Sequence, residues 1–529
     1  MSIRTPRIVS TETVLHVTCL LVIATYVAFI DLKGISTDEG IRLAIINGGA
    51  AFGFHEPSPH ASWSEVLKTI SPYAYQPLYY LMQNTLMSVA QTHNVIFFRL
   101  VNIFFLWVSL QGLLALSKQW QLVPRLFLIG LFSFNAYLFM HVLQIREYIV
   151  AVTFYIWSSW LVLQLDNRTL SRPWADSGWF TAYGLLLGVG FFTQTWVVFP
   201  AIGQFLFLIT RPRVDRWRFF SHLALSYLVV LSASWTYLQT NRQKVDVGRW
   251  GVESSALWPQ LSDGFHLAIV GHLDGHSLFT DLLFWFWIIL VVGAASLIWN
   301  RKFRVDGEVA PQDFKRQGCL MALCIAVSLS FQVGYFYKVE NLSVWPRYFV
   351  VHYFFLVWLI AMAFHFFYTA RKSKRLATWE RRGLNALTLI ALVVLTGSGA
   401  YQTRSYYQDP YLDTGLSRAY TWQTLSDGIS ATARAHDAVV FHDFVIRSTV
   451  TFSQPIPTAA VLLDDLEKLD LQAINRLIYL ESGFAEENRN RLADRLSALG
   501  FHALHEVAIP TDDGQSTLRE WQLLVFSRQ

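Results

Sequence analysis

Two adjacent carboxylates, Asp38 and Glu39, directly follow the first apolar stretch of membrane length, within the segment Ser36-Thr37-Asp38-Glu39-Gly40. A charged side chain is costly to place so close to lipid, and one that is kept there commonly marks chemistry or an ion site at the membrane surface. The alternative is a helix N-cap, because Thr37 and Asp38 both have side chains suited to that role. The elements that surround the acid pair decide between these two interpretations.

The composition is that of an integral membrane protein. Hydrophobic residues make up 53% of the 529 residues and charged residues 15%, whereas a soluble domain carries roughly 25% charged residues. The 20 tryptophans suit a chain with two membrane–water interfaces, where indole rings settle. The three cysteines (Cys19, Cys319 and Cys324) all lie in apolar stretches, which argues against a disulfide framework or a zinc site.

Apolar runs predict eleven spans. Arg4 and Arg7 precede the first run, which has no small-residue cleavage site after it, so we expect an uncleaved anchor with a cytoplasmic N-terminus. The apolar stretch 77–90 is interpreted as a juxtamembrane helix, because this choice puts every Arg-rich short loop on the cytoplasmic side. The predicted spans are 14–30, 97–116, 126–142, 147–165, 178–192, 196–210, 219–238, 281–299, 317–336, 347–369 and 384–401.

The charge pattern of the short loops sets the orientation. Together with the N-terminal arm, the cytoplasmic loops hold 21 of the 42 Lys and Arg residues. Spans 178–192 and 196–210 are short for a ~30 Å hydrocarbon core and could form a hairpin that does not cross fully, which leaves the orientation unchanged. The cytoplasmic loops are 117–125, 166–177, 211–218, 300–316 and 370–383.

Three regions are predicted to lie on the outer side besides the short turns: two long loops and the C-terminal domain. Residues 1–401 form the membrane domain, whose long outer loops are 31–96 and 239–280, and residues 402–529 form a soluble, extracytoplasmic α/β domain. Strands are predicted at 437–441, 477–480 and 521–526 and a helix at 485–499, which favours a small, partly parallel sheet.

Polar residues recur at the outer ends of the spans. An arginine in such a place is more often a snorkelling anchor than a ligand, and this alternative stays open for Arg347. For Arg146 the alternative is a structural ion pair with Glu147. Gly271 and Gly275 favour a loop around His272 and His276, which argues against a zinc site there. The outer-end residues are Arg146, Glu147, Tyr148, Gln194, Lys338, Arg347 and Tyr348.

These residues resemble the C-class (GT-C) glycosyltransferases that use polyprenyl-phosphate sugars, such as protein O-mannosyltransferases and bacterial aminoarabinose transferases. The resemblance extends over the whole chain in architecture, although each motif is short. Gln76 stands in place of a proline, Gln194 in place of a lysine, and no proline follows Tyr348. The matching motifs are Asp38-Glu39 with Arg42 and Ala44 downstream, Gln76-Pro77-Leu78-Tyr79-Tyr80, Phe98-Arg99-Leu100, Arg146-x-Tyr148 and Arg347-Tyr348.

The resemblance implies a GT-C-like polytopic fold and transfer of a sugar from a polyprenyl phosphate at the outer face of a bacterial inner membrane, with inversion of the anomeric carbon. Asp38 would be the general base and Glu39 a second catalytic residue that assists, binds a sugar hydroxyl or holds a metal. Arg or Lys must neutralise the departing phosphate. The residues expected to bind substrate are Arg146, Glu147, Tyr148, Gln76, Tyr79, Gln194, Lys338, Arg347 and Tyr348.

The expected partners are the lipid bilayer, the polyprenyl-phosphate sugar donor and a glycan, lipid or protein acceptor, with no nucleic acid. Some members of the class use a divalent ion, so Mg²⁺ or Mn²⁺ is a candidate cofactor. A transporter or flippase for a lipid-linked glycan precursor is the main alternative function. It would require inverted repeats and helices broken near the membrane midplane. A non-catalytic scaffold is the other alternative, and it leaves the acid pair unexplained.

Overall fold

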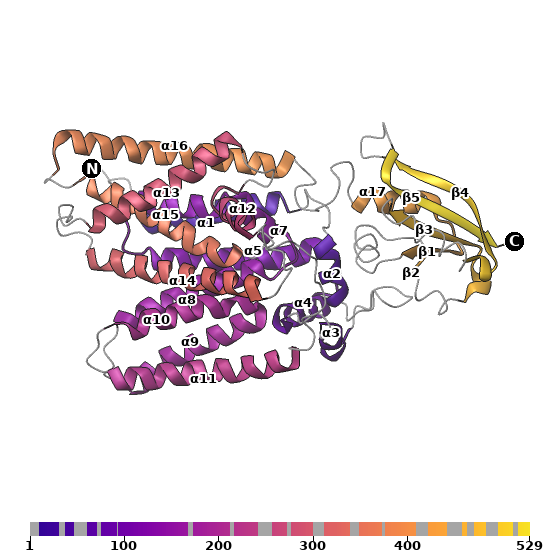
Figure 1. The fold of residues 1–529 in the computed structure, drawn as a ribbon, viewed down its shortest axis with the longest axis horizontal. Coiled ribbons are helices and arrows are strands. Elements are labelled where there is room, and N and C mark those ends of the chain that lie inside the picture. Colours follow the sequence, from indigo (N-terminus) through magenta and orange to yellow (C-terminus); the bar gives the residue numbers. More distant parts are fainter. Residues whose placement is uncertain are drawn as a thin grey trace, which may run out of the picture. The chain divides into compact units, whose positions relative to one another are not determined.

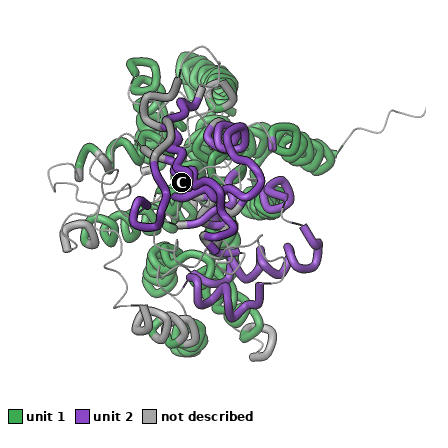
Figure 2. The backbone as a smooth tube through the Cα atoms, turned by 90° about the vertical axis from the view of Figure 1, so that its right-hand side faces the viewer, with its two compact units in different colours: residues 1–29, 100–143, 147–406 green, residues 30–99, 144–146, 407–529 purple. Residues whose placement is uncertain are grey.

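The computed structural model is mainly helical, with a five-stranded sheet near the C-terminus (Figure 1). The chain divides into two compact units, residues 1–29, 100–143 and 147–406 in the first and residues 30–99, 144–146 and 407–529 in the second (Figure 2). The structure describes residues 10–30, 37–46, 61–70, 76–92, 94–167, 173–211, 216–241, 257–271, 277–299, 311–338, 349–372, 376–408, 422–441, 458–462, 470–482, 496–510 and 517–528.

The first unit is built around helix α15 (Val350–Ala370). In α15, 89% of the most apolar window is buried, whereas α13 (Leu278–Trp299) and α16 (Thr378–Gln408) bury 22% of theirs. An apolar helix that the rest of the protein leaves uncovered is suited to face lipid. Helix α15 therefore forms the core of this unit, and α13 and α16 form part of its lipid-facing surface. Helix α15 packs against α6, α8, α12, α13 and α14.

The remaining helices of this unit follow the predicted apolar runs closely. They comprise α1 (Thr11–Ala28), most of α5 (Val95–Leu116), α6 (Leu122–Ser133), α7 (Ala136–Leu143), α8 (Tyr148–Asn167), α9 (Pro173–Thr193), η3 (Thr195–Val197), α10 (Val198–Ile209), α11 (Arg216–Asn241), α12 (Leu257–Val270) and α14 (Pro311–Lys338).

The chain is a polytopic membrane protein, as predicted, but the count of eleven spans stays a prediction. Within the described residues, seven helices are long and apolar enough to cross a membrane, or eight if the bent pair α6–α7 is one span. The predicted spans 178–192 and 219–238 are the helices α9 and α11, and 196–210 is the shorter apolar helix Thr195–Ile209.

The predicted span 126–142 is interrupted by a sharp bend. Helices α6 and α7 meet at 62° around Asn135. The Asn135 side chain accepts a hydrogen bond from the N–H of Tyr137 and so caps α7. Gln402 Oε1 accepts the N–H of Ala136 at 3.0 Å, and Gly271 lies so close that a Cβ there would stand 2.2 Å from this oxygen. The bend is therefore fixed by side chains from elements distant in sequence.

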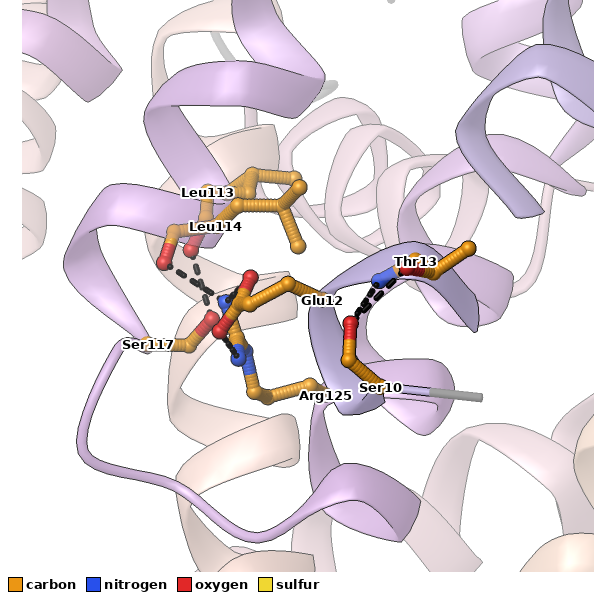
Figure 3. A network of polar contacts seen from close by, with 7 residues as sticks. All are labelled: Ser10, Glu12, Thr13, Leu113, Leu114, Ser117 and Arg125. Carbon is orange, nitrogen blue, oxygen red and sulfur yellow. Dashed lines mark hydrogen bonds and ion pairs between the residues drawn. The ribbon is translucent and has the colours of Figure 1, made fainter. Parts of the chain in front are cut away.

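One end of α1 is held to its neighbours by a buried arginine (Figure 3). Arg125 on α6 is 3% exposed and donates to Glu12 at 2.7 Å and to the carbonyl of Leu114 at 3.3 Å. Ser10 caps α1 by accepting the N–H of Thr13. The predicted N-terminal anchor is therefore a helix that is tied to α6 and to the end of α5.

The second unit contains three short helices within the predicted outer loop 31–96: α2 (Thr37–Ile46), α3 (Trp63–Ile70) and α4 (Pro77–Ala90). The predicted helix 77–90 is thus present with the same bounds. Helix α3 begins with a capping box, because Ser62 Oγ and N both donate to Glu65 and the N–H of Glu65 donates back to Ser62 Oγ. These hydrogen bonds, from the Ser62 backbone first, lower the pKa of Glu65.

The sheet of the second unit has the order β2-β1-β3-β5-β4. Strand β1 (Asp437–Phe441) pairs in parallel with β2 (Ala459–Leu462) and β3 (Arg476–Ser482), whereas β5 (Thr517–Arg528) pairs antiparallel with β3 and β4 (Phe501–Pro510). Alternate residues of β1 are buried in two apolar clusters, one containing Val439 and the other Val440. The partly parallel sheet is therefore as predicted.

Sequence reasoning located three of the five strands and missed β2 and β4. The predicted helix 485–499 lies mostly outside the described residues, and helix α17 (Trp422–Thr432) precedes β1. The compact unit that holds the sheet also includes residues 30–99 and 144–146. The predicted domain division into 1–401 and 402–529 remains a prediction.

Candidate functional site

Helix α2 carries the acid pair at its first turn. Thr37 is its first residue, so Asp38 and Glu39 lie where negative charge interacts favourably with the helix dipole. Glu39 is 1% exposed and Leu43, one turn further on, is buried as well. The backbone of Asp38 is helical, and its side chain lies outside the described part of the chain.

Glu39 is bound by a buried arginine at the start of α5. Nε of Arg99 donates to Oε1 of Glu39 and Nη2 donates to Oε2, both at 3.1 Å, so the pair has the two-pronged geometry of the stronger ion pairs. The third guanidinium nitrogen, Nη1, donates to the carbonyl of Ile30 at 2.9 Å. The Arg99 side chain is 3% exposed. This arginine therefore joins three segments: the chain after α1, helix α2 and helix α5.

The same carboxylate also holds the segment 144–146. The N–H of Ile145 donates to Oε1 of Glu39 at 3.0 Å, across 106 positions of sequence. The chain turns tightly at Ile145, because the N–H of Arg146 donates to the carbonyl of Gln144 at 2.8 Å. Arg146 itself is 6% exposed. The acid motif is thus hydrogen-bonded to Ile145, the residue directly before the motif Arg146-x-Tyr148.

Helix α4 packs against α2 and contributes aromatic and amide side chains. Asn84 donates to the carbonyls of Ile46 and Ala61, and so fixes the end of α2 to the segment that precedes α3. The guanidinium of Arg42 lies 5.8 Å from the ring centre of Tyr80, within range of a cation–π interaction. Arg42 is 5% exposed and lies one helical turn after Asp38 in the sequence of α2.

The predicted residues Gln76 and Tyr79 also belong to α4 or its start. Gln76 occupies the N-cap position and Pro77 the first turn, where a proline is favoured. Tyr79 is 1% exposed, and its hydroxyl accepts a hydrogen bond from Gln83 at 3.0 Å. Tyr79 and Tyr80 meet edge to face. Glu39, Arg146, Gln76 and Tyr79 are therefore members of one compact unit.

Three other predicted residues belong to the first unit. Glu147 and Tyr148 are 5% and 3% exposed at the start of α8, and Tyr148 lies edge-on to the ring of His141 at 4.7 Å. Gln194 is 5% exposed and is the residue before η3, where the chain turns from α9 into α10. All three side chains are buried within the first unit.

The side chains of the last three predicted residues lie outside the described part of the chain. Lys338 is the final residue of α14, and its side chain is outside the described set. Arg347 and Tyr348 fall in the segment 341–348, which is also outside the described residues. Their assigned roles remain predictions.

The resemblance allows Mg²⁺ or Mn²⁺ as a cofactor, which would need several oxygen ligands close together. No group of three or more His, Cys, Asp or Glu side chains among the described residues could hold a metal ion. Both oxygens of Glu39 already accept hydrogen bonds, two from Arg99 and one from Ile145. Glu39 therefore does not fit the part of a metal ligand in this arrangement.

Two residues of the site were missed as functional by sequence reasoning. Arg99 was quoted only within a motif, although an arginine at the start of an apolar run needs a partner, and this signal could have flagged it. Asn84 has no such signal, because its two acceptors are backbone carbonyls 38 and 23 positions away.

The structure defines the protein first by its fold: a GT-C-like membrane fold whose helix α2 carries the buried Glu39 and Arg42. The chain is similar to the crystal structure of ArnT from Cupriavidus metallidurans in the apo state, a GT-C glycosyltransferase, with a TM-score of 0.52 and 13% identity, over 98% of this chain and 97% of that one. The predicted GT-C-like fold is therefore confirmed.

Two further solved structures are similar over 98% of this chain. ArnT from Cupriavidus metallidurans bound to undecaprenyl phosphate gives a TM-score of 0.49 at 12% identity, with 97% of that chain covered. The arabinofuranosyltransferase AftD from Mycobacteria gives 0.49 at 11% identity, with 40% of that chain covered. Comparison with protein-family models gives no match, and comparison with curated proteins gives none either.

Proposed function

We propose that this chain is an integral-membrane glycosyltransferase that moves a sugar from a polyprenyl-phosphate donor to an acceptor at the outer face of a bacterial inner membrane. The observation that carries the proposal is the hydrogen bond from Ile145 N to Glu39, because it brings the acid motif of α2 next to Arg146. A transferase of this kind needs a base for the acceptor and a cation for the departing phosphate. The full-length similarity to the ArnT fold supports the same conclusion.

In the proposed reaction Asp38 is the general base. Its carboxylate takes the proton of an acceptor hydroxyl or amine as that group attacks the anomeric carbon. The bond from this carbon to the phosphate oxygen breaks, and its electron pair leaves with the polyprenyl phosphate. A single displacement of this kind inverts the anomeric configuration. Arg146, with Lys338 and Arg347, neutralises the charge on the departing phosphate through charged hydrogen bonds.

Glu39 has a supporting part in this mechanism. Its two oxygens are engaged by Arg99 and Ile145, so it holds helix α2 and the segment 144–146 at a fixed distance. A base one residue before Glu39 and a cation one residue after Ile145 are thereby positioned together. Enzymes gain much of their rate from such preorganised charge.

The decisive experiment measures release of polyprenyl phosphate from a panel of radiolabelled polyprenyl-phosphate hexoses and pentoses by the purified full-length protein. We expect turnover by the wild type and a loss of about 10²–10⁴-fold in Asp38→Asn, the range for a lost general base. Glu65→Gln is the matched control, because it makes the same change at an exposed carboxylate of the same loop. Full activity in folded Asp38→Asn protein would refute the assignment of the base.

Transport of a lipid-linked glycan precursor is the second candidate, and the bend between α6 and α7 favours it. Transporters commonly place their sites at helices that are broken within the membrane. The 62° bend at Asn135 is such a break. Reconstituted vesicles separate the two functions: flipping of a lipid-linked sugar without cleavage of its phosphate bond would support the transporter.

A further inference from the structure

A second charged cluster lies far along the chain from the acid pair, where α8 ends, α10 ends and α14 begins. Asp166, the residue before the last of α8, is only 6% exposed. Its Oδ2 atom accepts hydrogen bonds from Nε and Nη2 of Arg316 at 2.8 and 2.5 Å. Nε of Arg211 lies 3.7 Å from the same oxygen. We call these three residues the Arg211–Asp166–Arg316 cluster.

Helix packing explains why the two arginines meet. Helices α10 and α14 pack closely, and a Cβ at Gly203 would stand 2.8 Å from Cα of Cys324. Arg211 follows Gly203 by eight positions and Arg316 precedes Cys324 by eight. At a rise of about 1.5 Å per residue, Arg316 lies about 12 Å along α14 from Cys324, and Arg211 lies just beyond the end of α10, so both arginines lie next to Asp166. The packing of α10 on α14 therefore holds the cluster at the ends of these helices and of α8.

The three groups carry more positive than negative charge. Two guanidinium groups share a single carboxylate oxygen, so this cluster has a formal charge of +1. The Arg211 guanidinium is held over the ring of Phe207 at 4.5 Å from its centre. Its Nε and Nη2 atoms are shielded from solvent and have no hydrogen-bond partner among the described residues. Buried donors without acceptors are unfavourable, and an anion with several oxygens would satisfy them.

The surroundings indicate which anion. Trp217, the second residue of the next helix, is 87% exposed, and Trp160 of α8 lies 5.8 Å from Trp179 of α9. Tryptophan is enriched at membrane–water interfaces, so this end of the helices lies at the depth of the lipid headgroups. Basic pockets between membrane helices at this depth bind acidic headgroups. We propose that the Arg211–Asp166–Arg316 cluster binds the phosphate of an anionic phospholipid, at a site separate from the transfer reaction.

The test compares lipids retained by the full-length protein in nanodiscs of phosphatidylglycerol and phosphatidylcholine, measured by native mass spectrometry. Arg211→Gln removes one guanidinium and leaves the Arg316–Asp166 pair intact. Arg218→Gln is the matched control, because it makes the same change at an exposed arginine nearby. We expect Arg211→Gln to bind phosphatidylglycerol at this site about fivefold more weakly than the wild type does, because one arginine near an anionic surface contributes about this much. The variant should therefore retain one phosphatidylglycerol molecule fewer. Arg218→Gln should stay within twofold of the wild type.

Three results would overturn the proposal. Equal retention of phosphatidylglycerol by the wild type and Arg211→Gln would show that the cluster binds no lipid. An equal decrease in phosphatidylglycerol retention in Arg211→Gln and Arg218→Gln would show that the effect comes from general surface charge. Inorganic phosphate added to phosphatidylcholine nanodiscs provides the third arm: if it raises the melting temperature as much as phosphatidylglycerol does, and Arg211→Gln removes both effects, the ligand is free phosphate and the lipid assignment is wrong.

Discussion

The buried pair of Glu39 and Arg99 allows a quantitative test of how the site is held together. Substitution Glu39→Gln removes the negative charge but keeps the size of the side chain, and it leaves the Arg99 guanidinium, 3% exposed, without its counter-ion. Breaking a buried ion pair from one side typically costs about 3–5 kcal/mol, because the remaining charge is uncompensated. We expect a loss of this size in the free energy of unfolding for Glu39→Gln and for Arg99→Met alike.

The double substitution Glu39→Gln/Arg99→Met removes both charges and should be far less damaging than the sum of its parts. The coupling energy from this cycle should therefore be at the upper end of the range of 0.5–3 kcal/mol seen for residues in contact. The assay is reversible unfolding of the purified protein in mixed micelles with rising SDS content. Donor turnover, measured on the same samples, should fall with Glu39→Gln because α2 and the segment 144–146 lose their common anchor.

A matched control is provided by the ion pair of Glu12 and Arg125. It has the same residue types and an equally buried arginine, but Glu12 is 57% exposed, so water reaches this pair and Glu12→Gln should lower stability by less than Glu39→Gln does. If Glu39→Gln costs as little as Glu12→Gln, or if the double variant is simply additive, the anchoring argument is wrong. If Glu39→Gln abolishes turnover at unchanged stability, Glu39 acts directly in catalysis and its assignment as a positioning residue fails.

Three further predictions concern other parts of the chain. Arg347→Ala should weaken binding of a polyprenyl-phosphate sugar more than Arg347→Lys does, since Lys keeps the charge but loses the two-pronged geometry; equal affinities in a titration would make Arg347 a membrane anchor. Cysteines placed at Val214 and Val450 should be labelled from opposite faces of intact cells, and labelling from one face would refute the predicted orientation. The lowered pKa of Glu65 means that its contribution to the α3 capping box is complete above the ordinary carboxyl pKa and is lost as pH falls through the lowered value. Hydrogen exchange of α3 amides should show this acid-induced opening in the wild type, whereas Glu65→Gln should show none.

Much of the helical framework could be predicted because apolar runs of membrane length leave few alternatives. The predicted span 347–369 is α15, which begins at Val350, and the predicted strand 437–441 coincides with β1. The bend in 126–142 could not be predicted in the same way. It contains no proline, and its cause is the acceptor Gln402, more than 250 positions away.

The sequence motifs predict which residues form the candidate site, but they do not predict its geometry. The short motifs placed Glu39 and Arg146 in one site, and the structure adds the contact through Ile145. Sequence spacing carries no information on which arginine pairs with Glu39, because Arg42, Arg99 and Arg146 are all plausible by charge. The choice of Arg99 depends on the position of this one residue next to Glu39 in the folded unit, which is a property of the tertiary fold.

The bend at Asn135 has a consequence for the order in which the protein is assembled during synthesis. A nascent chain emerges N-terminal end first, so residues 122–143 leave the ribosome long before Gln402 has been made. Until then the N–H of Ala136 lacks the acceptor that it has in the finished protein. Completion of the bend must therefore wait for the arrival of the last membrane helix, α16. A ribosome-bound chain truncated just before Gln402 would already contain the helices that precede α16, but the N–H of Ala136 would still lack its acceptor.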